Sequence, residues 1–288
     1  MSATGTPPEK ARPPEMDAID SEDTSGLNGS RLAATVLLLR DGEAGLEVWV
    51  QERVSTMEHF PGHVVFPGGG VDSRDFPPRR WHSGDLWFGK SVVAMAHRMG
   101  INKYKAHALV FAAARELFEE AGALLTVSNG ISTSDAARYH ENRELLEGHV
   151  ISFTEFLTES ELQVDADRLL PWARWVGQTE SKQWFDTFFF LGKLPEGQYP
   201  DGNTGEADDA NWFTASLLIE GWRAGLVRLA APTWAQINRL AQFDTVAEAF
   251  ADASYSDLRP VIGDPEDDPR FAEYFHTNPI DRIKWRSQ

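Results

Sequence analysis

The chain has 288 residues, a formal net charge of −17 at pH 7 and no cysteine. The length suffices for one large domain with a sizeable core. The charge argues against a nucleic-acid partner, because phosphate recognition needs a basic footprint, and the missing cysteines exclude disulfides, thiolate metal sites and a cysteine nucleophile. Without an apolar run of about 18 residues or an export leader pattern, the sequence predicts a soluble, cytoplasmic protein that binds no membrane.

The first part of the chain predicts a tail and then the start of a domain. Residues 1–30 are rich in proline, serine, glycine and acids and lack apolar periodicity, so a disordered tail is expected there. One domain is expected over 31–245. Three strands open it, at 31–39, 46–54 and 62–66, and the first two form a hairpin. The third leads into Pro67-Gly68-Gly69-Gly70, where consecutive glycines let the main chain approach a ligand closely.

The segment 76–108 carries a short helix at 92–99 and a group of basic and aromatic side chains. These are Arg79, Arg80, Trp81, Trp87, Phe88 and Lys90. Such side chains suit a cover over a nucleotide, since bases stack on aromatic rings and arginine pairs with phosphate. They equally suit a packing flap whose tryptophans fill a small core of their own. The sequence leaves both readings open.

A helix is predicted from the N-cap Asn102 to Gly122. Its apolar stripe, which is expected to seat it on the sheet, consists of Leu109, Val110, Ala113 and Leu117. Residues three and four apart share a helix face, so Glu116, Glu119 and Glu120 present three carboxylates to one region near the negative end of the helix dipole. Three acids on one face are often just a solvated surface. A hard cation such as Mg2+, which prefers oxygen ligands, would offset their repulsion.

The second half of the chain alternates between helix and strand patterns. Helices are expected at 134–147 and 153–162, after Thr214 as N-cap, at 232–240, and from Asp244 as N-cap to about 253; strands are expected at 172–176 and 185–191. The helix at 153 opens with a capping box of Ser152 and Glu155. Residues 246–288 are expected to form a C-terminal helix and an extended tail.

The stretch Arg115-Glu116-Leu117-Phe118-Glu119-Glu120-Ala121-Gly122, taken with Gly69-x5-Asp75, resembles the Nudix box. That box reads Gly-x5-Glu-x7-Arg-Glu-U-x-Glu-Glu-x-Gly-U, where U is a bulky aliphatic residue. Ala123 stands at the last U, and Asp75 replaces the first glutamate. Residues 75 and 115 are 40 positions apart (115 − 75) where the ordinary box has 8, so 32 residues are inserted (40 − 8). This split box and the run Phe185-Asp186-Thr187-Phe188-Phe189-Phe190 resemble the Nudix branch that includes peroxisomal coenzyme A diphosphatases.

The resemblance implies an α/β fold, the Nudix α/β/α sandwich with a mixed central sheet, a large insertion at 76–108 inside the Nudix box and extra helices. It also implies a hydrolase that cleaves a diphosphate linkage in a small-molecule nucleoside diphosphate derivative, with Mg2+ or Mn2+ bound by Glu116, Glu119 and Glu120.

Further roles follow from the same resemblance. Glu116, Glu120 or Glu206 would take the proton from the attacking water, and the sequence does not decide among them. Arg115 is expected to hold a glutamate in place. Gly69 and Gly70 are expected to shape the loop that meets the substrate.

The residues before the glycines bear on the choice of substrate. Coenzyme A diphosphatases of this family carry a pattern there that Arg53, Gly62, Val64 and Phe66 match in register, and Arg53 and Phe66 are the expected substrate contacts. Glu58 stands where that pattern has a second arginine, which removes a favourable contact to a polyphosphate. The expected substrate is therefore coenzyme A or one of its thioesters, with ADP-ribose, NADH and other nucleotides as alternatives.

Two other classes of function stay open. One is a catalytically weak Nudix scaffold that binds a nucleotide as a sensor or partner module, which is expected if the split box misplaces Asp75. The other is a domain that binds only proteins. For the oligomeric state there is only the general expectation of a two-fold homodimer.

Overall fold

The computed structural model describes residues 23–53, 62–77, 84–179, 182–203 and 207–277. The strands of its main sheet are β1 (Arg31–Gly42), β2 (Gly45–Arg53), β3 (Val64–Val65), β4 (Gly68–Gly70), β9 (Leu169–Gln178), β10 (Trp184–Lys193), β11 (Ala207–Thr214) and β12 (Val261–Ile262). A smaller sheet contains β5 (Trp87–Phe88), β6 (Thr126–Ser128), β7 (Ile131–Ser132) and β8 (Gln163–Asp165).

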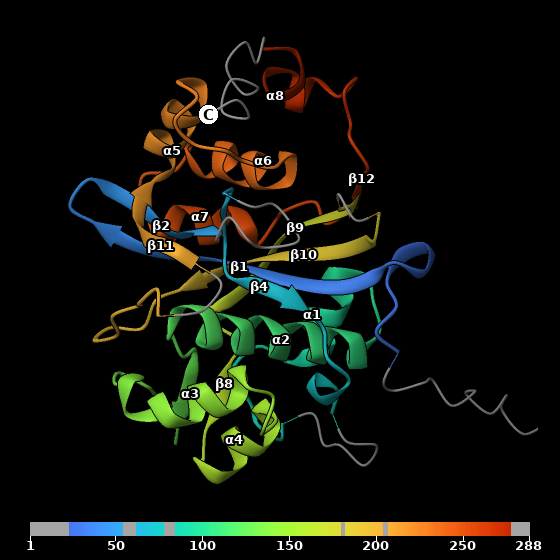
Figure 1. The fold of residues 1–288 in the computed structure, drawn as a ribbon. Coiled ribbons are helices and arrows are strands. Elements are labelled where there is room, and N and C mark those ends of the chain that lie inside the picture. The colour runs from blue at the N-terminus through green and yellow to red at the C-terminus, as the bar shows by residue number, and fades with distance from the viewer. Residues whose placement is uncertain (1–22, 54–61, 78–83, 180–181, 204–206, 278–288) are drawn as a thin grey trace, which may run out of the picture.

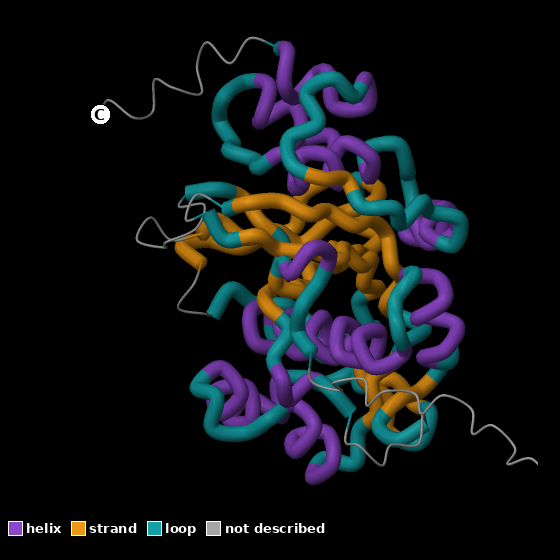
Figure 2. Tube along the Cα trace, turned by 90° about the vertical axis from the view of Figure 1, so that its right-hand side faces the viewer, coloured by secondary structure: helices purple, strands orange, loops and turns teal. Residues whose placement is uncertain are grey.

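Helices cover both faces of the main sheet, as Figures 1 and 2 show. On the lower side in Figure 1 are α1 (Val92–Met99), α2 (Lys103–Ala121), α3 (His140–Glu147) and α4 (Phe153–Glu159). On the upper side are α5 (Ala215–Arg223), α6 (Ala231–Leu240), α7 (Val246–Ala253) and α8 (Ala272–His276). No described helix is long and apolar enough to cross a bilayer.

The main sheet is mixed. Its strand order is β11-β2-β1-β10-β9-β12, with β3 paired to β2 and β4 paired to β1. β1 runs parallel to β10 and β12 runs parallel to β9, while β1 and β2 form the predicted antiparallel hairpin. This is the α/β/α sandwich with a mixed sheet that the resemblance implies.

β1 separates two cores because its side chains alternate between the two faces of the sheet. Leu32 and Val36 lie in the lower core with α2, whereas Leu37 and Leu39 lie in the upper core with α5, α6 and α7. A strand buried on both faces reads as a nearly continuous apolar run. That is the pattern of 31–39 in the sequence.

α2 is capped as predicted. Asn102 is its N-cap and accepts a hydrogen bond from Lys105 N at 2.9 Å, and Gly122 is its C-cap in the left-handed conformation, with φ of 64°. Glycine adopts that conformation without the strain that a Cβ would cause. The buried residues of α2 include its apolar stripe and also Arg115, Glu119 and Glu120. The helix therefore buries charge as well as apolar surface.

The segment between the two halves of the split box contributes to the lower core. Trp87 is 5% exposed, and its ring lies 6.4 Å from that of Phe111 in a stacked arrangement. Phe88, on the other face of β5, is 37% exposed. Arg79, Arg80 and Trp81 lie outside the described residues. Trp87 is thus a packing residue of the main domain rather than of a separate small core.

Three local predictions are wrong. The helix expected at 134–147 starts only at His140, after a 3-10 turn over Ala137–Tyr139, and Thr133 N still donates to Thr126 O in the small sheet. The N-cap of α7 is Thr245 and not Asp244, because Thr245 and Glu248 form a reciprocal capping box.

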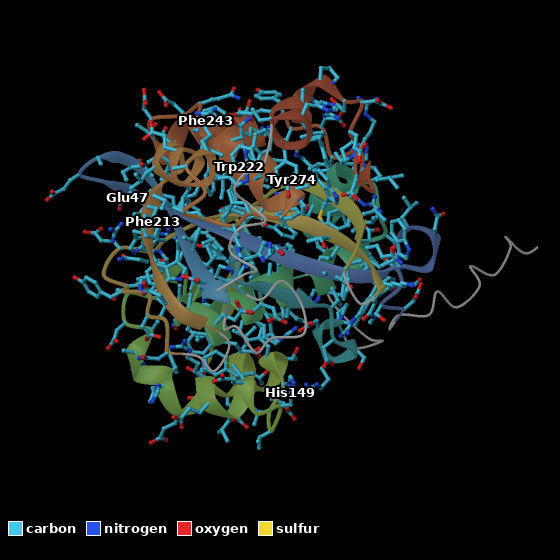
Figure 3. The ribbon with its side chains drawn as sticks, turned by 45° about the horizontal axis from the view of Figure 1, so that its top comes forward. Glu47, His149, Phe213, Trp222, Phe243 and Tyr274 are labelled. Atoms are coloured by element: carbon cyan, nitrogen blue, oxygen red, sulfur yellow. The ribbon has the colours of Figure 1, made fainter. Side chains whose placement is uncertain are left out.

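α8 was expected to be extended chain. Its Tyr274 donates to Leu229 O at 3.0 Å and stacks on Trp222 with ring centroids 5.7 Å apart, and Figure 3 shows these two rings together in the upper layer. These are contacts with residues about 50 positions away in sequence. They supply the stabilisation that a five-residue helix lacks alone.

Residues 23–30, at the start of the described chain, lie against the sheet. Leu27 N donates to Asp186 Oδ2 at 2.8 Å, and Lys105 Nζ donates to Asp23 Oδ2 at 2.8 Å. The segment therefore contacts both β10 and the first turn of α2.

Candidate active site

The glycines of β4 lie between two charged side chains. A Cβ on Gly69 would fall 2.5 Å from Glu116 Oε1, and a Cβ on Gly70 would fall 2.7 Å from Arg31 Nη2. Neighbouring residues of a strand face opposite sides, so Glu116 lies on the lower side of β4 and Arg31 on the upper side. Glycine is required here for close approach rather than for a positive φ.

Arg115 ties the two separated halves of the motif together. Its Nε and Nη2 donate to the two carboxylate oxygens of Asp75, each at 3.0 Å. Its Nη1 donates to Glu116 Oε1 at 2.8 Å and Glu119 Oε2 at 3.2 Å, and Nη2 also donates to Gly70 O at 3.2 Å. The planar guanidinium suits this arrangement because its donors diverge at fixed angles.

Asp75 is 1% exposed and sits at the end of a short 3-10 turn, Ser73–Asp75. Its Oδ2 accepts from Asp72 N at 2.8 Å, and its backbone oxygen lies 3.1 Å from His107 Nδ1. The inserted segment thus leaves and re-enters the domain without separating residues 75 and 115. Asp75 holds Arg115, and its side chain has no exposed surface to offer a ligand.

Burial and mutual repulsion perturb the ionisation of this cluster. Burial raises the pKa of Glu119 to about 7, although Arg115 acts in the opposite direction. Burial lowers the pKa of Arg115, but Glu116, Asp75 and Glu119 raise it more, so the net shift is upward. Arg115 is therefore always charged, while its single positive charge does not fully compensate the surrounding carboxylates.

The predicted residues are only partly brought together. Glu116 and Glu119 meet at Arg115 Nη1, and Glu120 is 7% exposed one residue further along α2. Phe66 is 4% exposed and packs in the upper core. Arg53 ends β2, paired with Ala207, and its side chain lies outside the described part, as does the whole of Glu206.

A divalent cation fits the chemistry of the three glutamates, since they offer only oxygen ligands and Glu119 and Glu120 are both buried at the end of α2. Within the described ranges, however, no three His, Asp or Glu side chains form a group arranged to hold a metal ion. Arg115 takes up one oxygen each of Glu116 and Glu119.

Two cavities of about 550 and 620 Å3 border residues that contact this cluster but do not contain its glutamates. The first lies between α2, α4 and residues 84–86, and the second lies beside residues 23–31. None of the three glutamates is among their lining residues. His107, which contacts Asp75, forms part of the wall of the first cavity.

Sequence reasoning missed two residues at the site. Gln51 is 3% exposed, and its Nε2 donates to Glu120 O at 3.0 Å. Gln51 lies two residues after Trp49 on β2 and so shares its buried face. A polar residue at such a position is a signal that would have identified it. Arg31 carries no comparable signal, because an arginine at the start of a strand is ordinary.

Comparisons with known proteins bear on this site. No protein-family model matches the chain. The chain is 26% identical over 212 residues to putative nudix hydrolase 7 of Caenorhabditis elegans, covering 74% of this chain and 61% of that protein. It is 22% identical over 234 residues to the acyl-coenzyme A diphosphatase NUDT19 of Xenopus laevis, covering 70% and 61%. The matches therefore span about three fifths of each relative.

A solved structure agrees with these sequence matches. The NUDIX hydrolase from Alicyclobacillus acidocaldarius has a TM-score of 0.65 and 26% sequence identity. The match covers 82% of this chain and 100% of that one. The likeness thus extends over most of the chain, in sequence and in fold.

Proposed function

We propose that this chain, which has the Nudix hydrolase fold and resembles Nudix hydrolases in sequence, cleaves a diphosphate linkage in a nucleoside diphosphate derivative. The observation that carries the proposal is the convergence of Asp75, Glu116 and Glu119 on Arg115, beside the glycines of β4. The catalytic unit in this proposal spans 31–245, with 76–108 as its insertion.

Arg115 acts on the carboxylates of the chain and not on the substrate. Asp75 fixes two of its nitrogens, which leaves Nη1 to hold Glu116 beside Gly69 and Glu119 one turn further on. The catalytic base is one of Glu116, Glu120 and Glu206. A base must lie within hydrogen-bond reach of the attacking water; Glu116 and Glu120 belong to α2, which packs against β4, and Glu206 precedes β11 in the sequence.

Glu116, Glu119 and Glu120 would hold Mg2+ or Mn2+, which supplies neutralisation of the phosphate charge and a bound water of lowered pKa. The residues of the chain do the rest. Gly69 and Gly70 let the main chain of β4 approach the phosphates without side chains in the way. The burial of Glu119 and Glu120 excludes bulk water from that side of the site and strengthens electrostatic interactions within it.

Coenzyme A or its thioesters are the first substrate candidates. The name of the Xenopus laevis relative, acyl-coenzyme A diphosphatase, supports this choice. So does the position of Arg53 in the pattern before the glycines, whereas Phe66 matches the pattern but is buried in the upper core. ADP-ribose and NADH share the diphosphate linkage and belong in the same test.

A nucleotide sensor without turnover is the second candidate. The observation in its favour is that Arg115 occupies an oxygen of both Glu116 and Glu119. A cation must therefore bind these two carboxylates through their second oxygens or compete with Arg115 for the oxygens that it holds.

A screen for Mg2+-dependent hydrolysis tests the proposal. Coenzyme A, acyl-coenzyme A, ADP-ribose, NADH and dinucleoside polyphosphates are offered, and product masses show which bond breaks. Glu120→Gln should lower kcat by about 10²-fold or more while the protein stays folded, because it removes a charge needed at the reacting phosphate. Glu147→Gln, at an exposed position of α3, is the matched control and should retain full activity.

The other outcomes separate the alternatives. A raised melting temperature with nucleotide and Mg2+ but without product supports the sensor. Neither product nor thermal shift supports a domain that binds only proteins. Turnover that is equal in the native protein and in Glu120→Gln rejects the proposed site.

A further inference from the structure

The last turn of α2, which carries Glu119 and Glu120, is held from outside the helix. A helix leaves its last four carbonyls without partners in the helix itself. In α2, Phe118 O accepts from Gly122 N at 3.0 Å, and Glu119 O accepts from Arg143 Nε at 2.9 Å. Glu120 O accepts from Gln51 Nε2 at 3.0 Å, and Ala121 O accepts from Asp201 N at 3.0 Å. Apart from Gly122, which is the C-cap of α2 itself, the donors come from three other parts of the chain: β2, α3 and the loop after β10.

Arg143 is the charged member of this set. It belongs to α3, is 5% exposed, and donates through Nη1 to Asp201 Oδ1 at 2.7 Å. Its Nη2 donates to Asn203 O at 3.4 Å. One guanidinium therefore joins the end of α2 to residues 201–203, which lead toward Glu206 and β11.

Gly122 makes this contact possible. A Cβ there would lie 2.8 Å from Arg143 Nη1 and 3.2 Å from Asp201 Oδ2, and φ is +64°. The glycine that ends the motif thus serves two purposes: it ends the helix and it admits the guanidinium against the helix end.

The electrostatics favour a cation at this place. The C-terminal end of a helix carries a partial negative charge, and Glu116, Glu119 and Glu120 add to it. Asp201, whose side chain is 43% exposed, balances part of the charge of Arg143. A lysine keeps the charge but loses the fixed fork that reaches a helix carbonyl, a carboxylate and a loop carbonyl together.

We propose that Arg143 is a positioning residue that fixes the last turn of α2, and so Glu119 and Glu120, relative to Glu116 at Gly69. The inference rests on the proposed function. Arg115 holds the side chains of Glu116 and Glu119, while Arg143 holds the backbone that carries Glu119 and the loop beyond it. If the last turn shifts, Glu119 and Glu120 move and Glu116 stays.

The test measures Mn2+ binding by the intact protein without substrate, from the electron paramagnetic resonance signal of free Mn2+. Arg143→Lys should weaken Mn2+ binding by about 10–100-fold, as changes behind metal ligands typically do. Arg138→Lys, at an exposed position before α3, should leave it unchanged. Amide hydrogen exchange at residues 118–122 should accelerate in Arg143→Lys only.

Kinetics add a second readout that a loss of stability alone does not produce. In Arg143→Lys, kcat should fall at saturating substrate while KM for the best substrate of the screen stays within about twofold. Arg143→Met should repeat the pattern more strongly; if it fails to fold, Arg143→Lys decides alone.

The inference is overturned if Arg143→Lys binds Mn2+ as tightly as Arg138→Lys, or if the native protein binds no Mn2+. If the native protein binds Mn2+ but cleaves no diphosphate, only the proposed function is rejected. In that case the Mn2+ affinity of Arg143→Lys still decides whether Arg143 positions the glutamates.

Discussion

The two faces of the central sheet bury different kinds of side chain. Among the described residues, the buried polar side chains of α6 and of the segment after α7 are neutral: Thr233, Gln236 and Ser256. Below the sheet, α2 and its neighbours bury Asp75, Arg115, Glu119, Glu120 and Arg143. A buried charge destabilises the fold unless it is paired. The apolar upper layer therefore stabilises the fold through burial, whereas the charged lower layer depends on the pairing of its charges.

The largest expected effect is at Asp75. Asp75→Asn leaves Arg115 without its bidentate partner, and breaking one side of a buried ion pair costs about 3–5 kcal/mol. The free energy of unfolding from urea titration measures this. Asp135→Asn, at an exposed position, should change stability by less than about 0.5 kcal/mol. A loss below about 1 kcal/mol with turnover retained would show that Asp75 is not the anchor of the cluster.

The upper layer should respond in stability alone. Ile237, on α6, is fully buried, and Ile237→Ala should cost about 2–5 kcal/mol through lost burial and the cavity left behind. Leu217→Ala, at a position that is 55% exposed on α5, is the matched control. At a temperature where both variants are folded, kcat should equal that of the native protein. A large fall in kcat for Ile237→Ala would break the division between the layers.

The sequence predicted what depends on local pattern and on a recognisable motif. The caps of α2 at Asn102 and Gly122, the hairpin of β1 and β2, and the helix 92–99 follow from neighbouring residues. The contact between Asp75 and Arg115 was not predicted, because the 40 positions of chain between them give no local signal and only the glutamates were expected to pair with Arg115.

The features that the sequence did not predict depend on contacts between residues far apart in the chain. The donors to the end of α2 come from Gln51, Arg143 and Asp201, which are 69, 24 and 80 positions from their acceptors (201 − 121 for the last). No periodicity encodes such pairs. Likewise α8 forms because Tyr274 packs on Trp222, and its five residues alone do not predict a helix.

His107, a titratable residue of the lower layer, should make the stability of the fold depend on pH. Burial lowers the pKa of His107 to about 3, against 6.5 ordinarily. Below pH 6.5 the unfolded chain binds a proton that the folded protein refuses, so His107 reduces stability as pH falls from 6.5 to about 3, by at most about 1.4 kcal/mol per pH unit.

His107→Gln keeps a hydrogen-bonding group near Asp75 O and removes this titration. The stability of this variant should fall less steeply than that of the native protein between pH 6 and pH 4. His97→Gln, at an exposed position of α1, should reproduce the native slope. Equal slopes in all three proteins would mean that His107 is protonated in the folded state.

The smallest effect is expected where charge lies at the edge of the lower layer. Asp23 pairs with Lys105 at 2.8 Å, but its side chain is 40% exposed, so Asp23→Asn should cost only about 0.2–1 kcal/mol at pH 7. The hydrogen bond from Lys105 lowers the pKa of Asp23 to about 2, so the pair stabilises the fold above pH 3.8 and is lost as pH falls toward 2. Urea titration of both proteins at low and high salt measures the difference, which should shrink in 1 M salt because screening weakens exposed pairs. A salt-independent loss above about 2 kcal/mol would mean that residues 23–30 stabilise the lower layer as strongly as Asp75 does. Asp23 would then count among the buried charges of that layer rather than among its exposed ones.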